Sequence, residues 1–149
     1  MPYKNAPPAR VIAAAREWLG TPYQHQASLK GVGCDCLGLL RGVWRDVLGE
    51  EPERPTSYSP SWAEAGGAES LLEAAQRHLI PCRDWEVAPG CILLFRWRAG
   101  LPVKHCGIAT SATHFIHAHD GACVAEVPLP PGWRRRIAAI FEFPEVKEE

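Results

Sequence analysis

The residues that could do chemistry in this sequence are one cysteine, Cys36, and two histidines, His105 and His117. A thiolate can attack a carbonyl carbon, one imidazole can act as its general base, and a second can fix the tautomer of the first. The three residues therefore indicate a thiol hydrolase site if the fold brings them together. Taken singly, each is more typical of a buried cysteine or an ordinary strand histidine, and the pairing of the histidines is what favours a functional site.

Cys36 is expected at the start of an amphipathic helix, because the apolar residues that follow Asp35 recur at positions 36, 40, 43, 44, 47 and 48. Asp35 is a good N-cap, since its carboxylate can accept from the free amides of the first turn, and Gly49 is a plausible stop. The first helical position lies at the positive end of the helix dipole, which favours the thiolate. Gly38 and Gly42 indicate that another backbone approaches this helix closely.

The two histidines fall on strands expected over 103–110 and 114–119, which would form a hairpin. A three-residue loop over 110–112 would pair Ala109 with Thr113 and set His105 directly opposite His117, with Cβ atoms about 5 Å apart. A loop shifted by two positions would pair His105 with His119 instead. His119 is therefore the competing residue for orienting His105.

Zinc binding and a redox couple are two other uses of these residue types. Cys34, Cys36, His105, Cys106 and His117 include enough ligands for tetrahedral zinc, but C-x-C is not the usual C-x₂₋₄-C pair. Strand alternation also directs the Cys106 side chain away from that of His105. The same spacing disfavours a Cys34–Cys36 redox couple. We therefore expect no metal and no cofactor.

These residues must be positioned by a first half rich in helices and a second half rich in strands. Helices are predicted over 8–19, from 36 to about 48, and within 61–80; strands are predicted over 91–98, 103–110, 114–119, 122–127 and 136–143. Helices followed by strands predict an α+β fold with an antiparallel sheet. The 149 residues fit a single domain over 1–149.

Composition excludes several function classes. With 16 basic and 17 acidic residues, the net charge of −1 does not indicate the basic surface that a nucleic-acid-binding protein needs. No apolar run approaches the roughly 20 residues of a membrane span, and the polar, proline-rich segment 1–10 does not resemble a secretion signal. Six cysteines without a signal indicate reduced thiols of a chain made in the cytoplasm. The run of arginines over 134–136 is typical of a solvated strand edge, with docking of a partner as the alternative.

Five motifs in order resemble the NlpC/P60 cysteine peptidases and, within that family, the short phage-type cell-wall peptidases of phage tails and gene transfer agents. Asp35-Cys36-Leu37-Gly38-Leu39 resembles the family's Asp-Cys-Ser-Gly-Leu nucleophile motif, and His105-Cys106-Gly107-Ile108 resembles its His-Val-Gly-Ile strand. The other three motifs are Trp18–Tyr23, Pro89–Phe95 and Phe115–Ala118.

The resemblance implies a circularly permuted papain-like fold with N-terminal helices packed on a C-terminal antiparallel sheet. Cys36 would be the nucleophile, His105 the general base and His117 the residue that orients His105. Tyr23 and Asp35 would line the cleft and contact the substrate. The implied substrate is a peptidoglycan (murein) stem peptide, often cut between D-Glu and the diamino acid.

The sequence also departs from the family pattern. Leu37 replaces the usual serine, Cys91 replaces the usual aspartate, and a longer loop containing His25 precedes the nucleophile. These changes bear on substrate preference rather than on the Cys–His core.

The resemblance further implies assembly with phage-like tail hub or tip proteins and action on periplasmic murein. Two alternatives stay open: a structural tail-tip module with little turnover, and a thiol acyltransferase or amidase that acts on a non-murein substrate.

Overall fold

The computed structural model describes residues 3–5, 7–53 and 70–147. In chain order its elements are β1 (Tyr3–Asn5), α1 (Pro8–Arg16), β2 (Ser28–Leu29), β3 (Gly33–Cys34), α2 (Cys36–Val47), α4 (Ser70–His78), β4 (Ile80–Pro81), β5 (Ile92–Phe95), β6 (His105–Ala109), β7 (His114–His117), β8 (Ala125–Pro128), α5 (Pro131–Arg134), β9 (Ile137–Glu142) and β10 (Glu145–Lys147).

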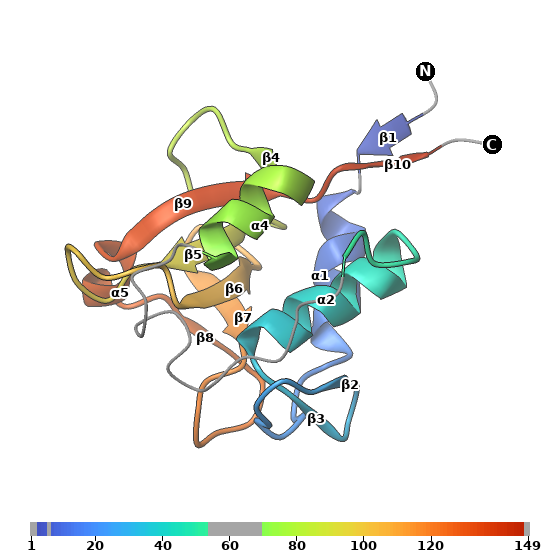
Figure 1. Cartoon of the computed structure of the whole chain (residues 1–149), viewed down its shortest axis with the longest axis horizontal. Helices are drawn as coiled ribbons and strands as arrows, with labels where there is room; N and C mark the ends of the chain where they lie inside the picture. The colour runs from blue at the N-terminus through green and yellow to red at the C-terminus, as the bar shows by residue number, and fades with distance from the viewer. Residues whose placement is uncertain (1–2, 6, 54–69, 148–149) are drawn as a thin grey trace.

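The main sheet has six strands in the order β4-β9-β5-β6-β7-β8, and all its neighbouring strands are antiparallel. It is built from the strand-rich second half, whereas α1 and α2 come from the first half (Figure 1). The predicted α+β class is therefore confirmed. The five predicted strands are all present with ends shifted by a few residues, as β5, β6, β7, β8 and β9.

Two apolar clusters lie on the two faces of this sheet, because successive strand residues point to opposite sides. Ile92 and Leu94 of β5 join the cluster that includes buried residues of α1, α2 and α4. Leu93 and Phe95 join the other cluster, against which Trp97 and Trp133 pack. Each fully buried side chain of this size stabilises the fold by about 1.5–3 kcal/mol. The two clusters hold the helices on one face and a tryptophan-rich layer on the other.

The glycines of α2 explain how closely this helix approaches the segment before it. A Cβ at Gly38 would overlap the carbonyl oxygen of Ala27, so a backbone does approach there, as predicted. A Cβ at Gly42 would overlap the indole of Trp18, which is a side chain rather than a backbone. Both contacts fix α2 against the chain that precedes it.

Two helix boundaries differ from the prediction. The first helix ends at Arg16 rather than at position 19, and Gly20 follows in a turn with φ +87°. Of the helix predicted within 61–80, α4 is present over 70–78, and residues 61–69 lie outside the described residues. None of the helices described is long and apolar enough to cross a membrane.

Candidate active site

Asp35 fixes the start of α2 as the sequence predicts. Its Oδ1 accepts a hydrogen bond from the Gly38 amide at 2.7 Å, and its Oδ2 accepts one from the Gln26 amide at 2.8 Å. The side chain is only 3% exposed. The same carboxylate thus caps the helix and ties down the preceding loop. Cys36 is the first residue of α2, at the positive end of its dipole.

Cys36 meets the beginning of β6, which lies far from it in sequence. Its Sγ is 3.8 Å from the Lys104 carbonyl oxygen, and the Cys106 thiol donates to the Cys36 carbonyl oxygen at 3.3 Å. Cys106 belongs to the helix-side cluster, as strand alternation predicts. The nucleophile candidate is therefore held at the strand that carries His105.

His105 and His117 form a buried pair. His105 Nε2 lies 2.9 Å from His117 Nδ1, and the two residues are 6% and 8% exposed. Burial, followed by the charges of His105 and His119, lowers the pKa of His117 to about 3. A neutral His117 can accept through Nδ1 from the Nε2–H of His105, a proton placement assigned from this contact. Nδ1 of His105 is then left for the Cys36 thiol, which lines the same cleft.

Of the two hairpin registers that the sequence offers, the one that pairs Ala109 with Thr113 is wrong, and the alternative shifted by two positions is observed. Ala109 pairs with Phe115, not with Thr113, and continuing this register sets His105 opposite His119. The loop starts one residue later than predicted, because Ser111 Oγ accepts from the amides of Thr113 and His114 and stabilises the turn.

The hydrogen bond nevertheless joins His105 to His117, because diagonal neighbours across a hairpin are within reach of long and aromatic side chains. Continuing the register sets Gly107 opposite His117, and the missing side chain leaves space for the imidazole: a Cβ at Gly107 would be only 3.1 Å from His117 Cβ. Gly107 is thus a site-shaping residue that the sequence analysis did not single out. An isolated glycine in a strand was the available signal.

The thiol, the first imidazole and the predicted substrate-contacting residues line one cleft of about 450 Å³. Tyr23, Asp35, Cys36 and His105 all contribute to its wall, together with Trp97, Lys104 and His119 among others. His117 is not among the lining residues; it lies behind His105. His119 is exposed, with its ring centroid 5.6 Å from that of His105. The role of each residue stays a prediction.

The electrostatics of the cleft favour a thiolate at Cys36. A hydrogen bond with Cys106 is the largest cause that lowers the pKa of the Cys36 thiol, burial opposes it, and the hydrogen bond and charge of His105 lower it further. The net pKa lies well below the ordinary value, while that of Cys106 is raised well above it. Burial and the charge of Cys36 also raise the pKa of Tyr23, so its phenol stays a hydrogen-bond donor.

Two tryptophans that the sequence analysis did not connect with the site enclose the histidine pair. Trp97 stacks on His105 with ring centroids 5.6 Å apart and planes 23° apart. Trp133 lies edge-on to His117 at 5.2 Å and to His105 at 5.7 Å. The two indoles also contact each other, with ring centroids 4.9 Å apart, and these packed aromatic rings limit access of water to the hydrogen bond between the imidazoles.

The zinc and redox alternatives can be compared with the observed positions. Among the residues with described coordinates, no three His, Cys, Asp or Glu side chains form a group that could hold a metal ion. Cys34 and Cys36 are both free thiols, and burial raises the pKa of Cys34 to about 12.

Solved structures with the same fold belong to NlpC/P60 proteins. An NlpC/P60 family protein from Bacillus cereus ATCC 10987 matches with a TM-score of 0.67 and 19% identity, covering 93% of this chain and 41% of that one. The NlpC/p60 domain of the peptidoglycan hydrolase SagA matches with a TM-score of 0.54 and 23% identity, covering 82% of this chain and 89% of that one. The papain-like NlpC/P60 fold expected from the sequence is therefore confirmed.

A curated relative was also found by sequence. The gamma-DL-glutamyl hydrolase of Bacillus subtilis (strain 168) is 27% identical over 134 residues, which is 89% of this chain but 29% of that protein. The chain thus spans less than a third of the length of this relative. No family model matches the chain.

Proposed function

We propose that this chain is a cysteine peptidase that hydrolyses amide bonds in the stem peptides of peptidoglycan. The observation that carries the proposal is that Cys36, at the start of α2, and His105 line one cleft, while His105 is hydrogen-bonded to His117. Two similar proteins support the reaction and the substrate class: one of the same fold is named a peptidoglycan hydrolase, and the curated relative is named a glutamyl hydrolase.

The reaction starts from the thiolate of Cys36 and the imidazolium of His105. The thiolate attacks the amide carbonyl carbon, and the negative charge that develops on oxygen is held by free amides at the start of α2. Those of Cys36 and Leu37 are available, because the Gly38 amide binds the Asp35 side chain and the Leu39 amide binds the Asp35 carbonyl.

His105 then protonates the leaving amine, and a water molecule activated by the same imidazole hydrolyses the thioester. His117 keeps the ring of His105 in position throughout. Tyr23, with its protonated phenol, is placed in the cleft to donate a hydrogen bond to the peptide backbone of the substrate.

The test is digestion of purified murein by the wild-type chain and by Cys36→Ala, with mass spectrometry of the released fragments. Cys123→Ala is the control, because Cys123 is an exposed thiol that does not line the cleft. We expect fragments cut at a stem-peptide amide with the wild type and the control, and none with Cys36→Ala. Release of fragments by Cys36→Ala at the wild-type rate would refute the nucleophile assignment.

The same experiment tests the two alternative functions. A wild-type chain that releases no fragments, and whose Cys36 is alkylated at the rate of free cysteine, would indicate a structural module. Consumption of a non-murein acyl substrate, with murein left intact, would indicate an acyltransferase or amidase.

The finer part of the proposal is that the chain acts within a phage-like tail. It rests on the motif resemblance. Its test is co-purification of the chain with intact tail particles in a density gradient, and absence from the particle fraction would refute it.

A further inference from the structure

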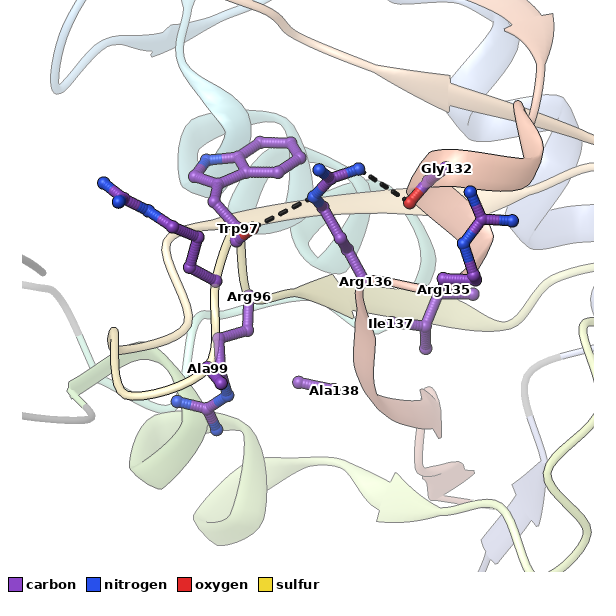
Figure 2. Close-up of a pocket in the computed structure, with 9 residues that line it drawn as sticks. Arg96, Trp97, Ala99, Gly132, Arg135, Arg136, Ile137 and Ala138 are labelled. Atoms are coloured by element: carbon purple, nitrogen blue, oxygen red, sulfur yellow. Dashed lines mark hydrogen bonds between the residues drawn. The ribbon is translucent and has the colours of Figure 1, made fainter.

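A second hollow of about 430 Å³ (Figure 2) shares Trp97 with the catalytic cleft, because Trp97 lines both. Its wall carries four arginines, Arg96, Arg98, Arg135 and Arg136, and no acidic residue lines it within the described ranges 3–5, 7–53 and 70–147. We call this hollow the basic pocket. The run of arginines that is typical of a solvated strand edge thus contributes two of its members to a defined concave site.

The sheet topology brings these arginines together from two distant segments. Arg96 and Arg98 follow β5, whereas Arg135 and Arg136 precede β9. These two strands are neighbours, and the Arg96 amide donates to the Arg136 carbonyl oxygen at 2.9 Å. Positive charge from two segments that are far apart in sequence is therefore concentrated where β5 ends and β9 begins.

Two backbone carbonyl oxygens, rather than a carboxylate, hold the guanidinium group of Arg136 in place. Its Nε donates to the Trp97 carbonyl oxygen at 3.0 Å, and its Nη1 donates to the Gly132 carbonyl oxygen at 2.8 Å (Figure 2). A Cβ at Gly132 would lie 3.3 Å from Arg136 Nη1 and 4.0 Å from Arg135 Nη2. Two guanidinium groups thus flank this glycine.

Arg98 and Arg135 are exposed, and neither makes an ion pair within the described part of the chain. Like charges held in one concavity repel each other, and an anion between them removes that repulsion. The planar guanidinium fork matches the geometry of a carboxylate, which it binds through two parallel hydrogen bonds.

We propose that the basic pocket is an exosite that binds a carboxylate of a peptide polymer whose scissile bond lies in the Cys36 cleft. The identity of that polymer rests on the proposed function. A γ-linked glutamyl residue keeps its α-carboxylate free, so a substrate that extends from the cleft past Trp97 can present this carboxylate to the arginines. The shared tryptophan wall makes the cleft and the exosite neighbours on one path.

The test measures binding of a short γ-linked glutamate oligomer to the full chain carrying Cys36→Ala, by isothermal titration calorimetry at low salt. The pocket variant adds Arg98→Gln and Arg135→Gln. The matched control adds Arg10→Gln and Arg83→Gln, which remove the same charge at exposed arginines that do not line either pocket. We expect about fivefold weaker binding for the pocket variant and less than about twofold for the control.

Equal weakening in both variants, or absence of measurable binding to the parent, would overturn the exosite. A glycerol-phosphate polymer of matched charge is the second probe. Binding of this polymer without binding of the carboxylate oligomer would overturn the assignment to a carboxylate. Because Cys36→Ala is used throughout, binding is measured independently of cleavage. If the oligomer binds in the pocket but the wild type does not digest murein, the proposed function fails and the exosite stands.

Discussion

Substituting Gly107 by alanine tests whether the close approach of β7 to β6 positions the histidine pair. The added Cβ would lie 2.7 Å from Phe115 Cδ2, 2.9 Å from the Ile116 carbonyl oxygen and 3.1 Å from His117 Cβ. The Ile116 oxygen belongs to the backbone and cannot rotate away, so β7 itself must shift by several tenths of an ångström. Overpacking of this kind lowers the free energy of unfolding by about 1–3 kcal/mol.

The same shift must disturb the hydrogen bond of 2.9 Å between His105 and His117. A buried hydrogen bond contributes about 0.5–1.5 kcal/mol, which corresponds to roughly a two- to tenfold loss in rate if it is needed in the transition state. We therefore expect Gly107→Ala to lower both stability, measured by urea unfolding, and kcat, measured with a soluble stem peptide under conditions where the variant is fully folded.

A double-mutant cycle separates positioning of His117 from general damage. If Gly107 acts through His117, the double variant Gly107→Ala/His117→Ala should have the same kcat as His117→Ala alone, although its stability stays lower because Phe115 is still crowded. Losses of kcat that multiply in the double variant would refute the reasoning. A wild-type kcat for His117→Ala would instead favour His119 as the orienting residue.

Two further predictions concern pH. Because the pKa of the Cys36 thiol lies well below its ordinary value, iodoacetamide should still label Cys36 at about pH 6, where free cysteine hardly reacts. Mass spectrometry of the labelled peptides measures the labelling rate. A rate that depends on pH as that of free cysteine does would contradict the prediction. The pKa of His117 is lowered from 6.5 to about 3 in the folded chain. Between these two pH values the unfolded chain therefore binds more protons than the folded chain. The stability that neutral His117 contributes is present above about pH 6.5 and is lost as the pH falls toward 3. The Tm of the wild type should fall more steeply over this range than that of His117→Phe, and parallel curves would contradict the assignment.

Features determined by local chemistry could be predicted from the sequence. The start of α2 depends on the Asp35 cap and the apolar stripe that follows it, and both lie within one short segment. The strands of the second half could also be predicted, since their apolar runs are separated by turn residues. Cys36 and His105 could be named because each lies in a motif that the chain shares with a known family.

Features that depend on pairing between distant segments could not be predicted. The sequence offers two hairpin registers, and one serine side chain decides between them because it sets where the turn begins. Trp97 and Trp133 are separated by much of the sheet sequence, and only the packed fold shows that they enclose the same imidazoles. The basic pocket depends on the pairing of β5 with β9, for which the arginine run itself contains no signal.

Trp97 connects the two halves of the proposed binding path through two different parts of the same residue. Its indole stacks on His105, whereas its carbonyl oxygen accepts from Arg136 Nε. The same residue therefore contacts both the candidate general base in the cleft and an arginine of the basic pocket. A substrate long enough to reach the basic pocket would reinforce this arrangement, while a short one would contact only the cleft. Substrate length should consequently affect KM through the arginines, whereas kcat depends on the thiol and the histidine pair.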